Sequence, residues 1–367
     1  MSVKRFLILP ALAVTLLGAF GLSGGGDASA QASAITVRVG DGEPGYAVTQ
    51  FLPSNVTVPT GATVTFKFGW FEVHHVALFE GAEPPPGEPA DTPSPATFPN
   101  TAKYVFSGDI NGDPAKPTLY NIKFTKAGTY AYHCFIHPRM DATVQVVDPG
   151  SAASGNIDNQ QSADARGNAQ YKSALVNIKD IKAGIKPGPD ASKPGGAKTV
   201  ENVAGLFTPG LGQALSFAPA VTSIREGDSV KWVERDGAPH NIVIGRPAPA
   251  DPFAYQGPKS GSVYNGTGDF QSPVFAGRGD FGPDVADNYE IVFSKAGTYN
   301  YICLLHVDQG MAGQIVVTAR GGAPLPPNTG SSFVADDESS ATGWLVVIGA
   351  ALLAVGIGGA STVRARR

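Results

Sequence analysis

Residues 122–134 read IKFTKAGTYAYHC, and residues 291–303 read IVFSKAGTYNYIC. In the first stretch, Ile122, Phe124, Tyr130 and Tyr132 alternate with other side chains on both sides of a Lys-Ala-Gly-Thr segment, and the second stretch has Ile291, Phe293, Tyr299 and Tyr301 at the matching positions. Alternation with a period of two is typical of strands that place one face on a core. The glycine permits a tight turn between two such strands. The two stretches therefore predict the same strand-turn-strand unit at two places in the chain.

The similarity extends upstream, so the body of the chain is a tandem repeat. Phe51-Leu-Pro53, Gly61-Ala-Thr-Val64 and His74 match Phe217-Ala-Pro219, Gly227-Asp-Ser-Val230 and His240 at a constant offset. Many short β-branched and aromatic strands separated by Gly and Pro turns predict an all-β fold, with an antiparallel β-sandwich in each copy. We expect two domains, 35–148 and 198–319.

Three segments lie outside this strand pattern. Residues 149–197 are polar and rich in small side chains, which predicts a linker with at most one short helix near Ala169–Val176. Two long Pro/Gly-rich excursions, at about 80–119 and 245–288, interrupt the copies. Loops of that length are usually functional or disordered.

Composition excludes several classes of protein. The 367 residues leave room for about two domains. A net charge of -4 argues against a nucleic-acid-binding protein, which would carry a basic patch. Two cysteines cannot form a disulfide-rich scaffold. The chain has no phosphate-binding glycine loop that leads into a helix.

Both ends have the features of targeting segments. Residues 1–30 combine Lys4 and Arg5, a short apolar run and Ala28-Ser29-Ala30, as in a secretory signal peptide. Residues 344–367 hold an apolar stretch followed by arginines, which predicts a membrane anchor with its tail inside. The stalk between, 320–343, contains Leu325-Pro-Pro-Asn-Thr-Gly330, which resembles a sortase signal with one extra proline. Attachment to the membrane and attachment to the cell wall both remain open, and each places the body outside the cytoplasm.

The scarce residue types gather in one pattern that occurs twice. Both cysteines, both methionines other than Met1, and four of the six histidines belong to it. The soft thiolate and thioether suit Cu(I), and imidazole suits both oxidation states. One histidine on an early strand plus Cys, His and Met on one late loop is the ligand set of a blue copper site. The predicted metal ligands are His74, Cys134, His137 and Met140 in the first copy, and His240, Cys303, His306 and Met311 in the second.

Both copies resemble cupredoxins, the plastocyanin, amicyanin and pseudoazurin family of blue copper proteins. Residues 132–140, YHCFIHPRM, have the short Cys-x₂-His-x₂-Met loop of amicyanin-like members, whereas residues 301–311 have the longer plastocyanin-like spacing. Ala238-Pro-His-Asn-Ile-Val243 matches the family's His-Asn strand. The resemblance implies a Greek-key β-sandwich and one type 1 copper per domain. It also implies that Cys134 and Cys303 dominate electronic coupling, that His137 and His306 lie nearest solvent, and that Met140 and Met311 are axial.

One position departs from the family pattern. In the family, an Asn after the first histidine ligand braces the cysteine loop; the second copy has Asn241 there, whereas the first has His75. The ungapped register assigns His74 as the ligand and His75 as the replacement for Asn. The choice between the two histidines stays open at this point.

The resemblance implies electron transfer, and together with the targeting segments it predicts an extracytoplasmic carrier of single electrons between redox partner proteins of the cell envelope. The net charge predicts no nucleic-acid partner. The alternative is a copper oxidoreductase of the nitrite reductase or two-domain laccase type, which needs an additional copper. Only His75 and His133 are left over to bind it, and the chain has no His-x-His pair. A copper storage protein would have Met- or His-rich tracts, which this sequence does not contain.

Overall fold

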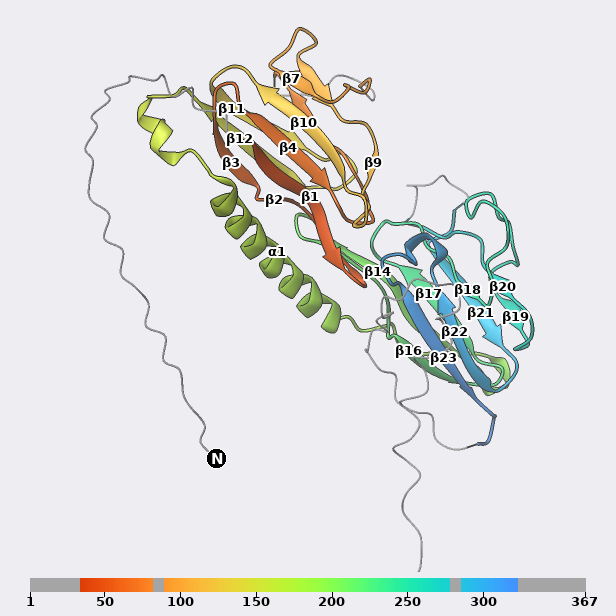
Figure 1. The fold of residues 1–367 in the computed structure, drawn as a ribbon. Coiled ribbons are helices and arrows are strands. Elements are labelled where there is room, and N and C mark those ends of the chain that lie inside the picture. Colours follow the sequence, from red (N-terminus) through yellow and green to blue (C-terminus); the bar gives the residue numbers. More distant parts are fainter. Residues whose placement is uncertain (1–33, 82–88, 278–284, 323–367) are drawn as a thin grey trace, which may run out of the picture. The chain divides into compact units, whose positions relative to one another are not determined.

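The computed structural model describes residues 34–81, 89–277 and 285–322 (Figure 1). Within these ranges the chain consists mainly of strands, with one α-helix and three short 3₁₀ turns. The predicted dominance of β-structure is confirmed. The predicted signal peptide and C-terminal anchor, and nearly all of the stalk, lie outside the described ranges. No helix within those ranges is long and apolar enough to cross a membrane.

Strands fall into two groups, which we call the first and second repeats. The first repeat contains β1 (Ile35–Glu43), β2 (Tyr46–Leu52), β3 (Asn55–Pro59), β4 (Thr63–Phe68), β5 (Val73–His74), β6 (Ala77–Phe79), β7 (Ala96–Phe98), β8 (Tyr104–Phe106), β9 (Ile110–Asn111), β10 (Thr118–Phe124), β11 (Gly128–His133) and β12 (Asp141–Val147). The second contains β14 (Lys198–Thr208), β15 (Gly212–Ala218), β16 (Val221–Arg225), β17 (Ser229–Glu234), β18 (Val243–Ile244), β19 (Ser262–Tyr264), β20 (Phe270–Gln271), β21 (Asn288–Phe293), β22 (Gly297–Ile302) and β23 (Ala312–Thr318). A short strand before them, β13 (Ala191–Ser192), pairs with β14.

The two repeats share one strand order. One sheet runs β3-β12-β11-β6-β8 in the first repeat and β16-β23-β22-β18-β20 in the second. The facing strands run β2-β1-β4-β10-β7 and β15-β14-β17-β21-β19. Each strand of these sheets therefore has a counterpart at the same place in the other repeat, as the sequence repeat predicts.

The sequence predicts an antiparallel β-sandwich in each copy, but several strand pairs are parallel. β1 pairs with β4 in parallel, β3 pairs with β12 in parallel, and the second repeat has the same two parallel pairs. The reason lies in the chain path. After the β1–β2 hairpin the chain crosses to the other sheet as β3 and returns as β4 beside β1. Local alternation does not specify which strands become neighbours after such a crossing.

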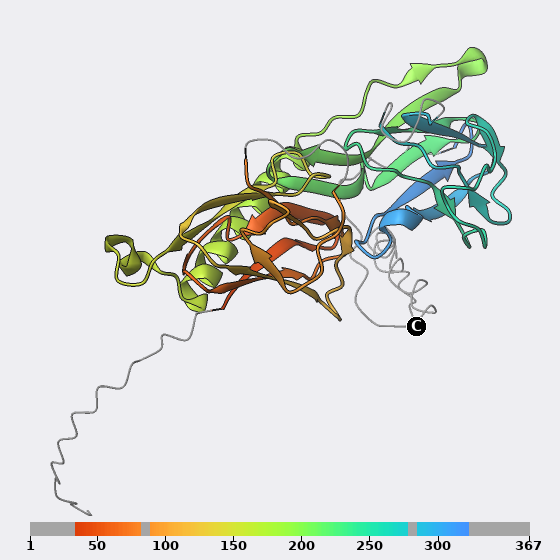
Figure 2. The ribbon, with the colours of Figure 1, turned by 90° about the horizontal axis from the view of Figure 1, so that it is seen from above.

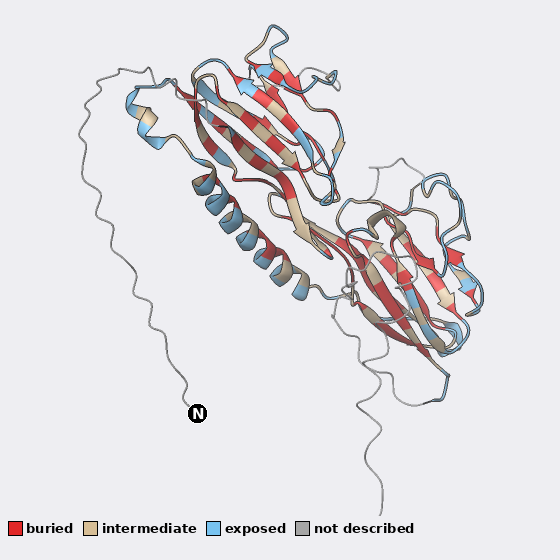
Figure 3. Ribbon diagram, viewed as in Figure 1, coloured by how far each residue is buried: buried red, intermediate tan, exposed pale blue. Residues whose placement is uncertain are grey.

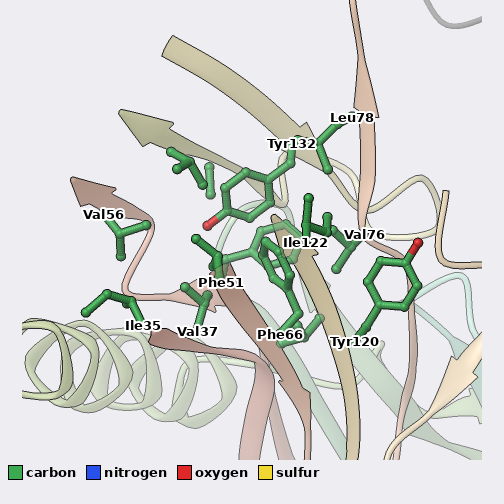
Figure 4. Packing of buried hydrophobic residues seen from close by; sticks show 14 of the residues in the cluster. Ile35, Val37, Phe51, Val56, Phe66, Val76, Leu78, Tyr120, Ile122 and Tyr132 are labelled. Atoms are coloured by element: carbon green, nitrogen blue, oxygen red, sulfur yellow. The ribbon is translucent and has the colours of Figure 1, made fainter. Parts of the chain in front are cut away.

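Each repeat has its own hydrophobic core between its sheets. Buried and less buried residues alternate along strands such as β4 (Figure 3). In the first core, the ring of Tyr132 lies 4.6 Å from that of Phe51 and 5.1 Å from that of Phe66 (Figure 4). The second core repeats this packing with Tyr301, Phe217 and Trp232. Each tyrosine lies two residues before a cysteine, so these rings support the end of the strand that carries the thiol.

The segment between the repeats contains a longer helix than the sequence predicts. Instead of one turn or two near Ala169–Val176, α1 spans Gln160–Ala183, and its first turn is capped by the Asn159 side chain. The helix packs along β1, β2 and β15 (Figures 1 and 2). A Cβ atom at Gly167 would lie 2.9 Å from the backbone of Leu52. Small side chains on the helix therefore permit its close approach to the sheet.

The repeats are joined directly as well as through α1. β15 pairs antiparallel with β2, with Gln213 opposite Ala47 and Ala214 opposite Tyr46. This pairing merges one layer from each repeat into a single sheet. A small apolar cluster that includes Val48, Ala214 and Ile178 fills the space between this sheet and α1.

The two long excursions are partly ordered. The first contributes β7, β8 and β9, and the second contributes β19 and β20. Four of these short strands extend the sheets at their edges, and β9 pairs with β5. Residues 82–88 and 278–284 of the excursions lie outside the described ranges.

Candidate metal centres

The first predicted ligand group converges at one end of the first repeat. His74 ends β5, and Cys134 follows β11 directly. The Cys134 Sγ atom lies 3.9 Å from Nδ1 of His74 and 3.4 Å from Nδ1 of His137. All three side chains are buried, and their ligand atoms lie within 4.8 Å of one another. Met140 is buried in the same core cluster as Cys134.

The second group has the same arrangement. The Cys303 Sγ atom lies 3.7 Å from Nδ1 of His240 and 3.5 Å from Nδ1 of His306. Met311 is buried beside Cys303 in the second core. In both groups the histidine from the cysteine loop is the more exposed of the pair, although His137 is only 8% exposed.

Backbone hydrogen bonds close each loop from cysteine to methionine. The Cys134 N–H donates to the carbonyl of Met140, and the Met140 N–H donates to the carbonyl of His137. Cys303, Met311 and His306 form the same pair of bonds. The residue before each methionine has a positive φ, 66° at Arg139 and 81° at Gly310. The same closed turn therefore accommodates two residues between His137 and Met140 and four between His306 and Met311.

The geometry separates His74 from His75. The ring of His74 joins the Cys134 group, whereas the ring of His75 pairs with Asp109. The His75 backbone N–H lies 3.3 Å from the Cys134 Sγ atom, as a donor to the thiol. In the second repeat, Asn241 Oδ1 accepts a hydrogen bond of 2.8 Å from the backbone of Leu304, the brace that the sequence resemblance implies.

The donor set fits copper. In each repeat, two imidazole nitrogens and one thiol lie within 4.8 Å of one another. The cysteine is free of any disulfide, and a buried methionine follows on the same loop. A His₂Cys plane with a weak methionine ligand is the blue copper pattern. A structural zinc site has four strong ligands in a tetrahedron, whereas each group here offers three strong donors and one weak thioether.

Comparison with known proteins agrees with this donor set. Residues 206–318 match the family model of copper-binding proteins of the plastocyanin/azurin family. Plastocyanin from Scenedesmus fuscus is 31% identical over 107 residues, which cover 28% of this chain and 88% of that protein. The chain belongs to the plastocyanin/azurin family. The family model matches only the second repeat. The first repeat resembles the second in its strand order and in its His-Cys-His group.

Other known proteins are also similar to this chain. Chloroplastic plastocyanin from Tetradesmus obliquus is 31% identical over 104 residues, and the match spans 28% of this chain and 59% of that protein. A purple cupredoxin from Nitrosopumilus maritimus is similar in structure at 21% identity and a TM-score of 0.21, over 32% of this chain and 98% of that one.

Each cupredoxin-like site favours the thiolate that a metal needs. Burial alone would raise the pKa of Cys134, but hydrogen bonds with His137 and His74, and their charge, lower it to about 5. Burial also opposes ionisation of Cys303, but the charge of His306 and hydrogen bonds from both histidines lower its pKa to about 5.

Two buried carboxylates beside the histidines were not identified from the sequence. Glu72 Oε2 lies 3.2 Å from Nε2 of His74, and Asp236 Oδ1 lies 2.9 Å from Nε2 of His240. Burial would raise the pKa of Glu72, but hydrogen bonds from His137 and His74 hold it well below its usual value. The repeat pattern gave no signal, because Glu72 precedes its histidine by two residues and Asp236 by four.

The two leftover histidines do not form a further site. His75 pairs with Asp109, and His133 Nδ1 lies 2.6 Å from Asp141 at the surface. In the part of the chain that the structure describes, the groups of three or more metal-binding side chains are the two already given. No observation in these residues favours the additional copper of an oxidoreductase.

Proposed function

We propose that this protein carries single electrons between redox partners of the cell envelope, through one type 1 copper ion in each repeat. The observation that carries the proposal is the matched pair of His-Cys-His groups. Membership of a copper-binding family supports it. Copper would supply a one-electron change between Cu(I) and Cu(II) at each site.

The chain's own residues supply a rigid and water-poor setting for that change. In the first site, His74, Cys134, His137 and Met140 would hold the ion; in the second, His240, Cys303, His306 and Met311 would do so. The backbone bonds that close each cysteine-to-methionine loop, and the aromatic packing beneath it, resist rearrangement. Little movement between the two oxidation states favours rapid electron transfer.

Electrons would enter and leave near the loop histidines. Phe135 and Ile136, which lie between Cys134 and His137, are exposed. Exposed apolar side chains beside a more accessible ligand suit a small and weak contact with another redox protein. The partners themselves are proposed only as a class, redox proteins of the envelope.

The location and domain plan belong to the same proposal. Each repeat would be a Greek-key cupredoxin domain, 35–148 and 198–319. Residues 1–30 would direct secretion, and residues 320–367 would tether the body to the membrane or the cell wall. The electron carrier would then work outside the cytoplasm.

The two sites should have different reduction potentials. The methionine spacing differs between the loops, and the carboxylate of Glu72 reaches both histidines of the first site, with Oε1 3.4 Å from Nε2 of His137. Groups that touch the ligands tune a metal's potential. A potentiometric titration followed by visible absorption should give two separate one-electron midpoints. A single two-electron wave would contradict unequal sites.

A further inference from the structure

Glu72 occupies an unusual position because one carboxylate contacts both ligand histidines of the first site. Its Oε2 atom lies 3.2 Å from Nε2 of His74, and its Oε1 atom lies 3.4 Å from Nε2 of His137. In both rings Nδ1 faces the thiol of Cys134. Nε2 is therefore the nitrogen that faces the carboxylate in each ring, and among the described residues neither Nε2 of His74 nor Oε2 of Glu72 has another hydrogen-bond partner.

A hydrogen-bond donor from the second repeat also reaches this carboxylate. The Gln213 side-chain amide, on β15, donates to Oε1 of Glu72, and both side chains are buried. The Gln213 amide thus donates the hydrogen bond to this buried carboxylate, and the two imidazole Nε2 atoms face it at 3.2 and 3.4 Å.

The backbone that carries Glu72 is also held by the second repeat. The Gln309 side-chain amide donates to the carbonyl of Phe71, and the Gln309 carbonyl accepts from the N–H of Gly45. Gln309 lies on the loop between His306 and Met311. Within the first repeat, the carbonyl of Glu72 accepts a bond of 3.0 Å from Gly112. The position of Glu72 thus depends on both repeats.

The second site is built differently. Its buried carboxylate, Asp236, contacts His240 and accepts a bond of 2.9 Å from the N–H of Ala238. Both partners belong to the second repeat itself. A change at Glu72 or Gln213 should therefore affect the first site and not the second, so the second site serves as a control within the same chain.

We propose that Glu72 is a positioning residue that fixes both histidine ligands of the first copper site, and that the second repeat holds it in place through Gln213. The inference rests on the proposed function, since it needs copper at the first site. A negative charge this near a buried site stabilises the more positive oxidised ion and lowers the potential. Docking of the second repeat therefore helps to set the geometry and the potential of the first site.

The test uses the full-length chain with Glu72→Gln, which keeps the size and a hydrogen-bond acceptor but removes the charge. We expect the midpoint of the first site to rise by at least 59 mV, a tenfold change in its Cu(I)/Cu(II) equilibrium. The midpoint of the second site should move by less than a third of that. A first-site midpoint that stays within a twofold change, or equal shifts at both sites, would overturn the role of Glu72.

Gln213→Leu tests the contribution of the second repeat and leaves Glu72 and both histidines in place. We expect the EPR signal of the first site to broaden, because the carboxylate loses its anchor, and the signal of the second site to stay unchanged. The matched control is Gln314→Leu, because Gln314 is an equally buried glutamine whose amide bonds to Asn300 within the second repeat. An unchanged first-site signal in Gln213→Leu would overturn the anchoring role.

The outcomes separate this inference from the proposed function. A wild-type chain that binds no copper would contradict the proposed function itself. Two bound coppers, with a first-site midpoint that does not change in Glu72→Gln, would contradict only the role of Glu72. If Glu72→Gln fails to fold, which a thermal unfolding scan reveals, Gln213→Leu decides the inference, because it changes neither the carboxylate nor a ligand.

Discussion

Replacing Gly205 with alanine should weaken copper binding at the second site and leave the first site unchanged. Gly205 lies at the irregularity in the β14–β15 pairing and has a φ of +69°. A Cβ atom there would lie 1.8 Å from Asp236 Oδ2 and 2.7 Å from His240 Nε2. The carboxylate of Asp236 and the ring of His240 must then move. We therefore expect copper affinity at this site to fall at least about a hundredfold, about 2.8 kcal/mol. Competition with a copper chelator measures it.

A matched glycine separates the steric effect from backbone strain. Gly261, also in the second repeat, has a φ of +87°, and a Cβ atom there would meet nothing within 4 Å. Gly261→Ala should therefore cost stability through its backbone alone, and leave both coppers bound. In the first repeat, Gly40→Ala should weaken copper binding at the first site instead, because its Cβ would lie 2.3 Å from His74 Nε2. Full copper affinity in Gly205→Ala would contradict the assignment of His240.

Cys303→Ser should remove about half of the intense visible absorption and leave the band of the first site. That absorption comes from the copper–thiolate bond, and a serine hydroxyl cannot replace the soft thiolate. Cys134→Ser should remove the other half, and the double variant should be colourless. Absorption and EPR spectra of the oxidised protein measure the loss.

The single variants also test whether the sites load independently. Each thiol bonds within its own repeat, with His74 and His137 or with His240 and His306. The remaining site should therefore keep its spectrum when the other thiol is lost. Disappearance of both bands in Cys303→Ser would show that the first site cannot form without the second.

The grouping of His and Cys side chains at two places could be predicted from the sequence because the residue types are scarce. Cysteine and methionine are so few in this chain that their recurrence beside histidines in two copies points to one chemistry. Strands such as β4 and β21 could also be predicted, since apolar residues alternate along them and lie buried in the structure. Both the ligand spacing within each loop and the alternation within each strand involve residues close together in the chain, and such patterns can be read directly from a sequence.

The parts that sequence reasoning missed depend on contacts between distant segments. Helix α1 buries Ala163, Gly167 and Ala174 on its sheet-facing side, so its apolar periodicity is faint although its packing is close. The contact of Gln213 with Glu72 joins two repeats through the pairing of β2 with β15. Such a contact follows from strand neighbours across the repeats, which alternation within a strand does not specify.

The measurement that tests the central claim most directly is metal analysis of the purified protein combined with visible and EPR spectra of its oxidised form. Two converging His-Cys-His groups predict two copper ions per chain, both with the spectra of blue copper. A chain that binds no copper, or binds zinc in its place, would contradict the account. A third, colourless copper would favour a catalytic oxidoreductase over an electron carrier.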